Sequence, residues 1–244
     1  MFGKKSKLGE VVNKNVNLLP FLRRMELKLG FGDKTIEEIC IENNINIEFF
    51  IELMHLIVKK YDFNPKYINN FETILTINFL RKSHLSYINE SLPKIEQLIV
   101  NLQELELSRM EDTNVLLKFF KLYEKDFHSH INYEDTIIFP YILQVEKNYK
   151  LKTNDLVIKN LIKDNTIKNY IKQHDSLNEQ LNDLKNLLIK YFQPFQNEFI
   201  TQSLIYALYD LESDLLYHEL IENQILFPQV NKMEQFLLNL GSKD

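Results

Sequence analysis

The chain has 244 residues, of which 45% are hydrophobic, so it is long enough to bury a full core. Its net charge of −5 argues against a general nucleic-acid-binding protein, which would usually carry a basic stripe. It contains no run of 18 apolar residues and no apolar signal core near its start, so we expect a cytoplasmic protein without a membrane span. The single cysteine, Cys40, excludes an intramolecular disulfide framework and has a buried, apolar position as its default role.

The secondary structure is predicted to be helical throughout. Five glycines and six prolines are few for this length, and the hairpin dipeptides Asn-Gly and Asp-Gly are missing. Leucine, isoleucine, glutamate, lysine and asparagine dominate in long periodic runs, which is typical of amphipathic helices. The fold class is therefore expected to be all-α.

Residues 1–64 are predicted to form a small helical domain. A turn is expected at residues 30–33, which read Gly-Phe-Gly-Asp. Thr35 and Glu38 have the spacing of a capping box, which would open a short helix over residues 36–42.

A longer helix is predicted over residues 47–60, with Asn46 as its N-cap. Two helices joined by a short link invite a DNA-binding interpretation. However, the second helix is acidic and aliphatic until its last two residues, which favours packing over phosphate contact. Its aromatic residues offer a dimer surface instead, so a homodimer is left open. The domain boundary is expected at residues 62–65, which read Asp-Phe-Asn-Pro.

Residues 70–240 are predicted to form an up-down-up-down four-helix bundle, because long helical patterns alternate with short polar links. Pro93 is expected to kink the first helix, Pro140 and Pro228 to end or bend the second and fourth, and Pro194 to lie just beyond the third. The four helices are expected over residues 70–106, 113–139, 165–192 and 197–227.

A duplicated stretch is the strongest functional signal. Residues 124–140 read EKDFHSHINYEDTIIFP, and residues 212–228 read ESDLLYHELIENQILFP, at a constant offset of 88 residues. A His and a Glu four residues apart lie on one helix face, about 6 Å apart along the axis. Each copy carries Asp-x3-His-x3-Glu: Asp126, His130 and Glu134, then Asp214, His218 and Glu222.

One further histidine precedes each copy, by 46 and 44 residues, in a segment predicted to be helical. Imidazole and carboxylate together suit iron, manganese or zinc, and one glutamate from each of two helices could bridge two metal ions. Four histidines would then supply two nitrogen ligands per ion and leave open positions, as in reactive sites. The predicted metal ligands are His84, His130, Glu134, His174, His218 and Glu222. A structural bundle that holds zinc or no metal is the alternative.

Residues near these ligands were assigned supporting roles. Asp126 and Asp214 lie one turn before a ligand histidine, where each could accept its second ring N–H, or could be an ordinary surface acid. The apolar residues 137–139 and 225–227 are expected to close the bottom of the pocket.

The remaining candidates are expected to be structural. Tyr87 and Tyr170 lie one turn from His84 and His174, where core packing is favoured over an approach to the metals. His55 is expected to pack, and His128 to face solvent or a neighbour. The Glu-x2-His spacing of ferritin-like bundles occurs only at Glu52 and His55, outside the predicted bundle, so a ferritin-like site is excluded.

The full ligand spacing, with the two Phe-Pro dipeptides, resembles the hemerythrin-like cation-binding domain over residues 70–230. Within that family it is most similar to the di-iron proteins called repair of iron centres (RIC). The resemblance implies two iron ions, with an oxo bridge as one option, and Glu134 and Glu222 as carboxylate bridges. It also implies restoration of iron–sulfur clusters after nitrosative or oxidative damage.

The sequence differs from known members of this family at two places, and each difference limits the function that the resemblance implies. Respiratory hemerythrins have a fifth histidine at the site, for which this chain offers no counterpart, so a reversible oxygen carrier is disfavoured. RIC proteins often carry two adjacent cysteines in an N-terminal helical domain, which residues 17–60 faintly resemble. At the corresponding place this chain reads Gly30-Phe31-Gly32, so a cysteine-based step is not supported.

Two functions follow from the sequence. The first is a RIC-like di-iron stress protein that donates iron to damaged iron–sulfur proteins or reacts with nitric oxide, peroxide or oxygen. The alternative is a module that senses oxygen or nitric oxide and signals through residues 1–64. Neither hypothesis requires a nucleic acid or a membrane as partner.

Overall fold

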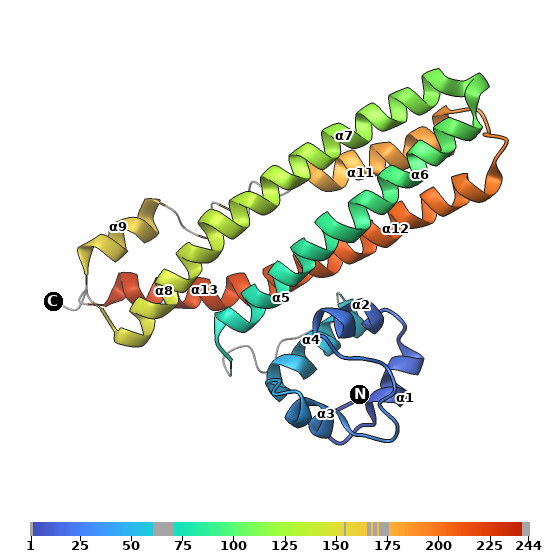
Figure 1. Cartoon of the computed structure of the whole chain (residues 1–244). Helices are drawn as coiled ribbons and strands as arrows, with labels where there is room; N and C mark the ends of the chain where they lie inside the picture. The colour runs from blue at the N-terminus through green and yellow to red at the C-terminus, as the bar shows by residue number, and fades with distance from the viewer. Residues whose placement is uncertain are drawn as a thin grey trace. The chain divides into compact units, whose positions relative to one another are not determined.

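The computed structural model describes residues 2–60, 71–153, 155–164, 167, 170 and 176–240 (Figure 1). Within these residues the chain is helical, and its only β-type pairing is an isolated bridge between Lys7 and Thr35. The all-α prediction is confirmed. None of the helices in these ranges is long and apolar enough to cross a membrane.

The helices follow in chain order, in three groups. The first group is α1 (Leu8–Lys14), α2 (Leu18–Arg24), α3 (Ile36–Glu42), α4 (Ile47–Lys59) and α5 (Thr73–Ser86). The second is α6 (Leu92–Leu105), the 3-10 turn η3 (Leu107–Arg109), α7 (Met110–Tyr133), α8 (Phe139–Leu151) and α9 (Leu156–Asp164). The last is α11 (Ser176–Asn186), α12 (Glu198–Ile221) and α13 (Phe227–Asn239). In the described residues, three π-helical turns join consecutive α-helices: η2 (Tyr87–Ser91), η4 (Glu134–Ile138) and η6 (Glu222–Leu226). A fourth, η5 (Leu187–Tyr191), follows α11 and ends it.

Contacts divide the chain into two compact units. One comprises Met1–Lys82, Ile142–Lys159 and Tyr217–Asp244, and the other comprises Ser83–Tyr141 and Asn160–Leu216. The boundary predicted at residues 62–65 lies outside the described residues, so the division at that point stays a prediction.

The second unit is built around the four helices α6, α7, α11 and α12, which run alongside one another (Figure 1). The buried residues of each helix recur every three or four positions, so each helix presents one apolar stripe to the others. On α7 this stripe is Leu116, Phe120, Tyr123, Phe127 and Ile131. The predicted four-helix bundle is therefore present.

Arg109 ties the two loops at one end of this bundle together. Its guanidinium donates to the carbonyl oxygens of Gln193 and Pro194 at 2.6 and 3.0 Å. The same group pairs with the Asp112 carboxylate and lies over the Phe195 ring, 4.7 Å from its centroid. The Arg109 side chain thus donates hydrogen bonds to two carbonyl groups of the loop after η5. Its ion pair with Asp112 fixes it at the start of α7.

Arg109→Ala should destabilise the bundle by about 1–3 kcal/mol, because several charge-assisted hydrogen bonds are lost together. Arg109→Lys should recover only part of this, since an ammonium group lacks the planar fork that reaches both carbonyls. Urea unfolding followed by circular dichroism measures the difference. The exposed Lys118 provides the control, and a loss in Lys118→Ala equal to that in Arg109→Ala would contradict the assignment.

The first unit contains the N-terminal helices, and its local signals were predicted correctly. Thr35 accepts a hydrogen bond from the Glu38 N–H while Glu38 accepts from the Thr35 N–H, which is the expected capping box. The Asn46 side chain caps α4 by accepting from the Phe49 N–H at 2.9 Å. However, α4 buries its aromatic residues within the chain, and Phe50 is fully buried. This helix therefore does not supply the aromatic dimer surface that was left open.

Cys40 lies inside the same unit, as its default role predicted. Burial raises the pKa of its thiol to about 12. Because the thiolate is the reactive form, iodoacetamide at pH 8 should leave the folded chain unmodified, with labelling only in denaturant. Mass spectrometry before and after addition of urea measures this. Rapid labelling of the native chain would contradict the buried position.

The helices continue through three prolines that were expected to kink, end or bend them. A proline ring clashes with the carbonyl four residues earlier and has no N–H to donate. Here a π-helical turn precedes each of Pro93, Pro140 and Pro228, and its widened hydrogen bond places an extra residue in that turn. Phe139 donates to the Glu134 carbonyl and Phe227 to the Glu222 carbonyl. The prediction that helices could end at Pro140 and Pro228 was wrong.

Candidate metal centre

Both predicted bridging glutamates begin a π-helical turn. Glu134 is the first residue of η4 and Glu222 the first residue of η6, and each turn lies directly before a Phe-Pro pair. The sequence repeat is thus also a repeat of an uncommon backbone geometry. Such π-turns inside α-helices are frequently found at functional sites.

The Glu134 carboxylate is fully buried and lies between two imidazoles. Its Oε2 atom is 3.1 Å from His84 Nε2, and its Oε1 atom is 3.2 Å from His130 Nε2. The buried Tyr170 hydroxyl donates to Oε1 at 2.6 Å. Each carboxylate oxygen therefore faces a different histidine, which suits a carboxylate shared by two cations.

The second nitrogen of His84 has its own partner. Nδ1 donates to Asp135 Oδ2 at 3.2 Å, and the imidazole stacks on Phe139 with 5.7 Å between ring centroids. Burial lowers the pKa of His84, but the hydrogen bonds to Asp135 and Glu134 outweigh it, so the pKa is raised. Metal-binding histidines commonly donate their other N–H to a carboxylate, which fixes the ring orientation.

The second copy of the motif is arranged differently. His218 Nδ1 lies 3.6 Å from Glu222 Oε2, and both side chains are buried. Within the first unit, these two side chains could offer an imidazole nitrogen and a carboxylate oxygen to one cation. The first copy uses Nε2 toward its glutamate and the second uses Nδ1, so the repeat is not symmetric at the atomic level.

The other residues selected from the sequence differ in their burial and in their contacts. His174 lies outside the described residues. Asp126 is exposed and accepts from Gln180 Nε2 at 3.0 Å, which fits the second of its two alternatives, an ordinary surface acid. His128 is exposed, as expected. Tyr87 is a core residue, as expected, and its hydroxyl donates to the Asp214 carbonyl.

Most of the apolar residues that follow the two glutamates are buried, and their closing of the pocket stays a prediction. Phe139 and Phe227 are buried, as are Ile138 and the two residues before Phe227. Ile137 is instead 50% exposed. The π-turn rotates the positions after Glu134, so an ideal-helix projection places them incorrectly.

Sequence reasoning missed two residues that touch the site. Asp135 has no match in the repeat, where the corresponding residue is Asn223, so the duplication gave no reason to select it. Tyr170 was noticed, but packing was favoured over a polar role. A tyrosine one turn from a predicted ligand was the only signal available, and the buried contact with Glu134 corrects that preference.

The donor chemistry fits a transition-metal cation. A buried carboxylate needs a compensating positive charge, and a cation held beside the Glu134 carboxylate would provide it. A cation bound to the imidazole nitrogens that face Glu134 would leave the His84 Nδ1–H donating to Asp135. Nitrogen and carboxylate oxygen together suit iron, manganese or zinc rather than magnesium or calcium.

The structure is an all-α bundle in which two buried glutamates begin π-turns and histidines on neighbouring α-helical turns face them. The Hemerythrin HHE cation binding domain family model matches residues 77–230 of the chain. The chain therefore belongs to the hemerythrin HHE family, whose domains bind metal cations, typically iron. A search of curated proteins found no match to the chain.

Proposed function

We propose that this chain is a non-haem di-iron protein that acts in the response to nitrosative or oxidative stress, in the manner of RIC proteins. The observation that carries the proposal is the buried Glu134 carboxylate, whose two oxygens face His84 and His130 separately. The duplicated motif supplies His218 and Glu222 with the same spacing and the same π-turn. The proposed ligand set is His84, His130, Glu134, His174, His218 and Glu222.

The histidine inventory supports a reactive centre rather than an oxygen carrier. Of six histidines, His128 is exposed and His55 lies in α4, with its ring against Phe2 and its Nε2 at 3.0 Å from the Phe2 carbonyl oxygen. Four histidines remain for two iron ions, so coordination positions are left for a small exogenous molecule. Bound iron would supply reversible electron transfer and a place for nitric oxide, peroxide or oxygen.

The chain's own residues would hold and orient that centre. Tyr170 donates to Glu134 Oε1 and so limits rotation of the carboxylate. Asp135 fixes the His84 ring, and Phe139 covers one of its faces. Since Cys40 is buried and is the only cysteine, iron donation would proceed without a cysteine relay. A damaged iron–sulfur protein in the cytoplasm is the proposed acceptor.

Metal content is the primary test. Protein purified without oxygen and without added metal should contain about two iron ions per chain by elemental analysis, as expected for six ligands shared by two ions. His130→Ala combined with His218→Ala should lose this iron. His128→Ala is the matched control and should retain it, because that side chain is exposed. Zinc, or full iron loading in the double variant, would overturn the di-iron assignment.

The stress role needs a separate test. An iron–sulfur dehydratase inactivated by nitric oxide should regain activity when the iron-loaded protein is added under anaerobic conditions. The double histidine variant should not restore it. If both proteins restore activity equally, iron donation from this centre is wrong even where the metal content is as expected.

One observation favours the sensor function as a second candidate. Within the first unit, Phe21 of α2 lies 5.7 Å from Phe79 of α5, and Glu26 pairs with Lys82 of α5 at 2.7 Å. His84 lies on the same helix, so movement of α5 would reach the N-terminal helices. Hydrogen exchange over residues 17–60 should then change when nitric oxide is added to iron-loaded protein. Unchanged exchange would remove this candidate.

A further inference from the structure

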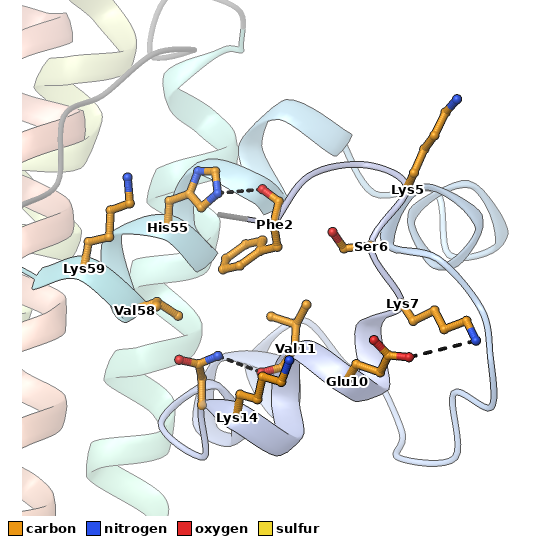
Figure 2. Close-up of a pocket in the computed structure, with 11 residues that line it drawn as sticks. Phe2, Lys5, Ser6, Lys7, Glu10, Val11, Lys14, His55, Val58 and Lys59 are labelled. Carbon is orange, nitrogen blue, oxygen red and sulfur yellow. Dashed lines mark hydrogen bonds and ion pairs between the residues drawn. The ribbon is translucent and has the colours of Figure 1, made fainter.

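The N-terminal helices border a cavity that none of the predicted metal ligands lines. This cavity of about 750 Å³ is bordered by the N-terminal segment, α1 and the end of α4 (Figure 2). This volume lies within the roughly 300–1,000 Å³ range of small-molecule sites. All of its lining residues belong to the first unit.

Part of the cavity lining is apolar. Figure 2 shows the Phe2 ring and the Val11 and Val58 side chains bordering one space. The His55 ring lies beside Phe2, with 4.5 Å between the ring centroids, and His55 Nε2 is 3.0 Å from the Phe2 carbonyl oxygen. That contact holds the start of the chain against α4. Two adjacent rings give a flat ligand an apolar surface to contact.

The rim of the cavity is positively charged. Four lysines and one glutamate line it, a formal balance of +3 in a chain whose net charge is −5. The glutamate, Glu10, forms an ion pair with Lys7, and Lys7 forms a second ion pair with Asp33 at 2.9 Å. The other three lysines make no ion pair with any acid in the part of the chain that the structure describes; they are Lys5, Lys14 and Lys59.

We propose that this cavity binds a small organic anion of nucleotide size, with a flat apolar body against Phe2 and anionic groups toward Lys14 and Lys59. The lysines that line the cavity would attract an anion, and the adjacent Phe2 and His55 rings would contact its flat part. The proposal is independent of iron, because none of the predicted metal ligands lines the cavity.

ATP is the test probe, since it combines a flat base with a triphosphate. Calorimetry should use the full chain in excess chelator, without magnesium or iron, so that the metal centre does not contribute. Saturable binding should be seen, with adenosine and inorganic triphosphate each at least about tenfold weaker, because each offers only one of the two features. Raising the salt concentration should weaken ATP binding, since the lysines are exposed or half-buried.

Substitutions test the lysines and the Phe2 ring of the site separately. Lys14→Gln with Lys59→Gln should weaken ATP binding about tenfold or more through lost charge attraction, whereas Lys118→Gln should not. Phe2→Ala should weaken ATP binding but leave inorganic triphosphate unchanged. Circular dichroism confirms that each variant is folded.

Three results would overturn the proposal. The first is the absence of saturable ATP binding up to about 5 mM, a concentration that corresponds to only about 3 kcal/mol of binding free energy. The second is equal ATP affinity in the double lysine variant and in Lys118→Gln. The third is tighter binding of a duplex DNA oligonucleotide that the same double variant abolishes, which would assign the lysines to a nucleic acid instead.

Discussion

Glu134→Ala is expected to weaken iron binding at least about 100-fold, since loss of an outer partner alone costs roughly 10–100-fold. The variant removes a fully buried carboxylate that faces both His84 and His130. Their imidazoles would then have to bind iron without the negative charge between them. Anaerobic competition with a chromogenic iron(II) chelator, together with the iron content of purified protein, measures the effect.

Two further variants provide an intermediate loss of iron affinity and a control. Asp135→Asn keeps the size of the side chain that contacts His84 Nδ1 but removes its charge, so a loss of about 10–100-fold is expected. Glu104→Ala removes an exposed carboxylate on α6 and should leave affinity unchanged. The same affinity in all three variants would show that Glu134 is not a ligand. Circular dichroism on each metal-free variant separates lost binding from lost folding.

Phe120→Ala is expected to destabilise the metal-free chain by about 3–5 kcal/mol, the usual cost of removing a buried phenyl ring. Phe120 is fully buried on α7, where it packs with Tyr123, whose own burial raises the pKa of its hydroxyl. The surrounding bundle core would be left with a cavity that its helices fill only in part. Urea unfolding of chelator-treated protein at 25 °C gives the free energy of unfolding.

The neighbouring Phe119 provides a matched control with the same side chain and helix. It is 45% exposed, so Phe119→Ala should change stability by no more than about 0.5 kcal/mol. A similar loss in both variants would mean that α7 does not present the face described here. If Phe120→Ala leaves too little folded protein to measure, the milder Phe120→Leu should still lower the free energy of unfolding more than Phe119→Leu does.

The sequence by itself determined the helical class, the bundle and the candidate ligand set. The helices were predictable because apolar residues recur every three or four positions, as on α7 from Leu116 to Ile131. Local caps were equally predictable, because the Thr35 capping box and the Asn46 cap depend only on residues within one turn. The repeat of His-x3-Glu, at His130 and His218, selected candidate ligands without any structure.

Only the tertiary structure decided which residues support those ligands. Asp135 reaches His84 from 51 positions away, and Tyr170 reaches Glu134 from 36 positions away. Such contacts depend on how neighbouring helices are rotated and staggered, which one-helix periodicity does not specify. Asp126 was selected because it lies one turn before His130, yet it contacts Gln180 on another helix.

The π-turns explain why local rules misjudged the ends of the helices. A proline predicts a break when only the regular i to i−4 hydrogen bond is considered. A π-turn with one extra residue precedes both Pro140 and Pro228, so the helix can continue without a break. These two π-turns begin at the two predicted bridging glutamates. Whether a helix ends or widens at a proline depends on how much apolar surface the continuing helix buries. That burial is a property of the folded chain, and it kept α8 and α13 helical beyond the Phe-Pro pairs.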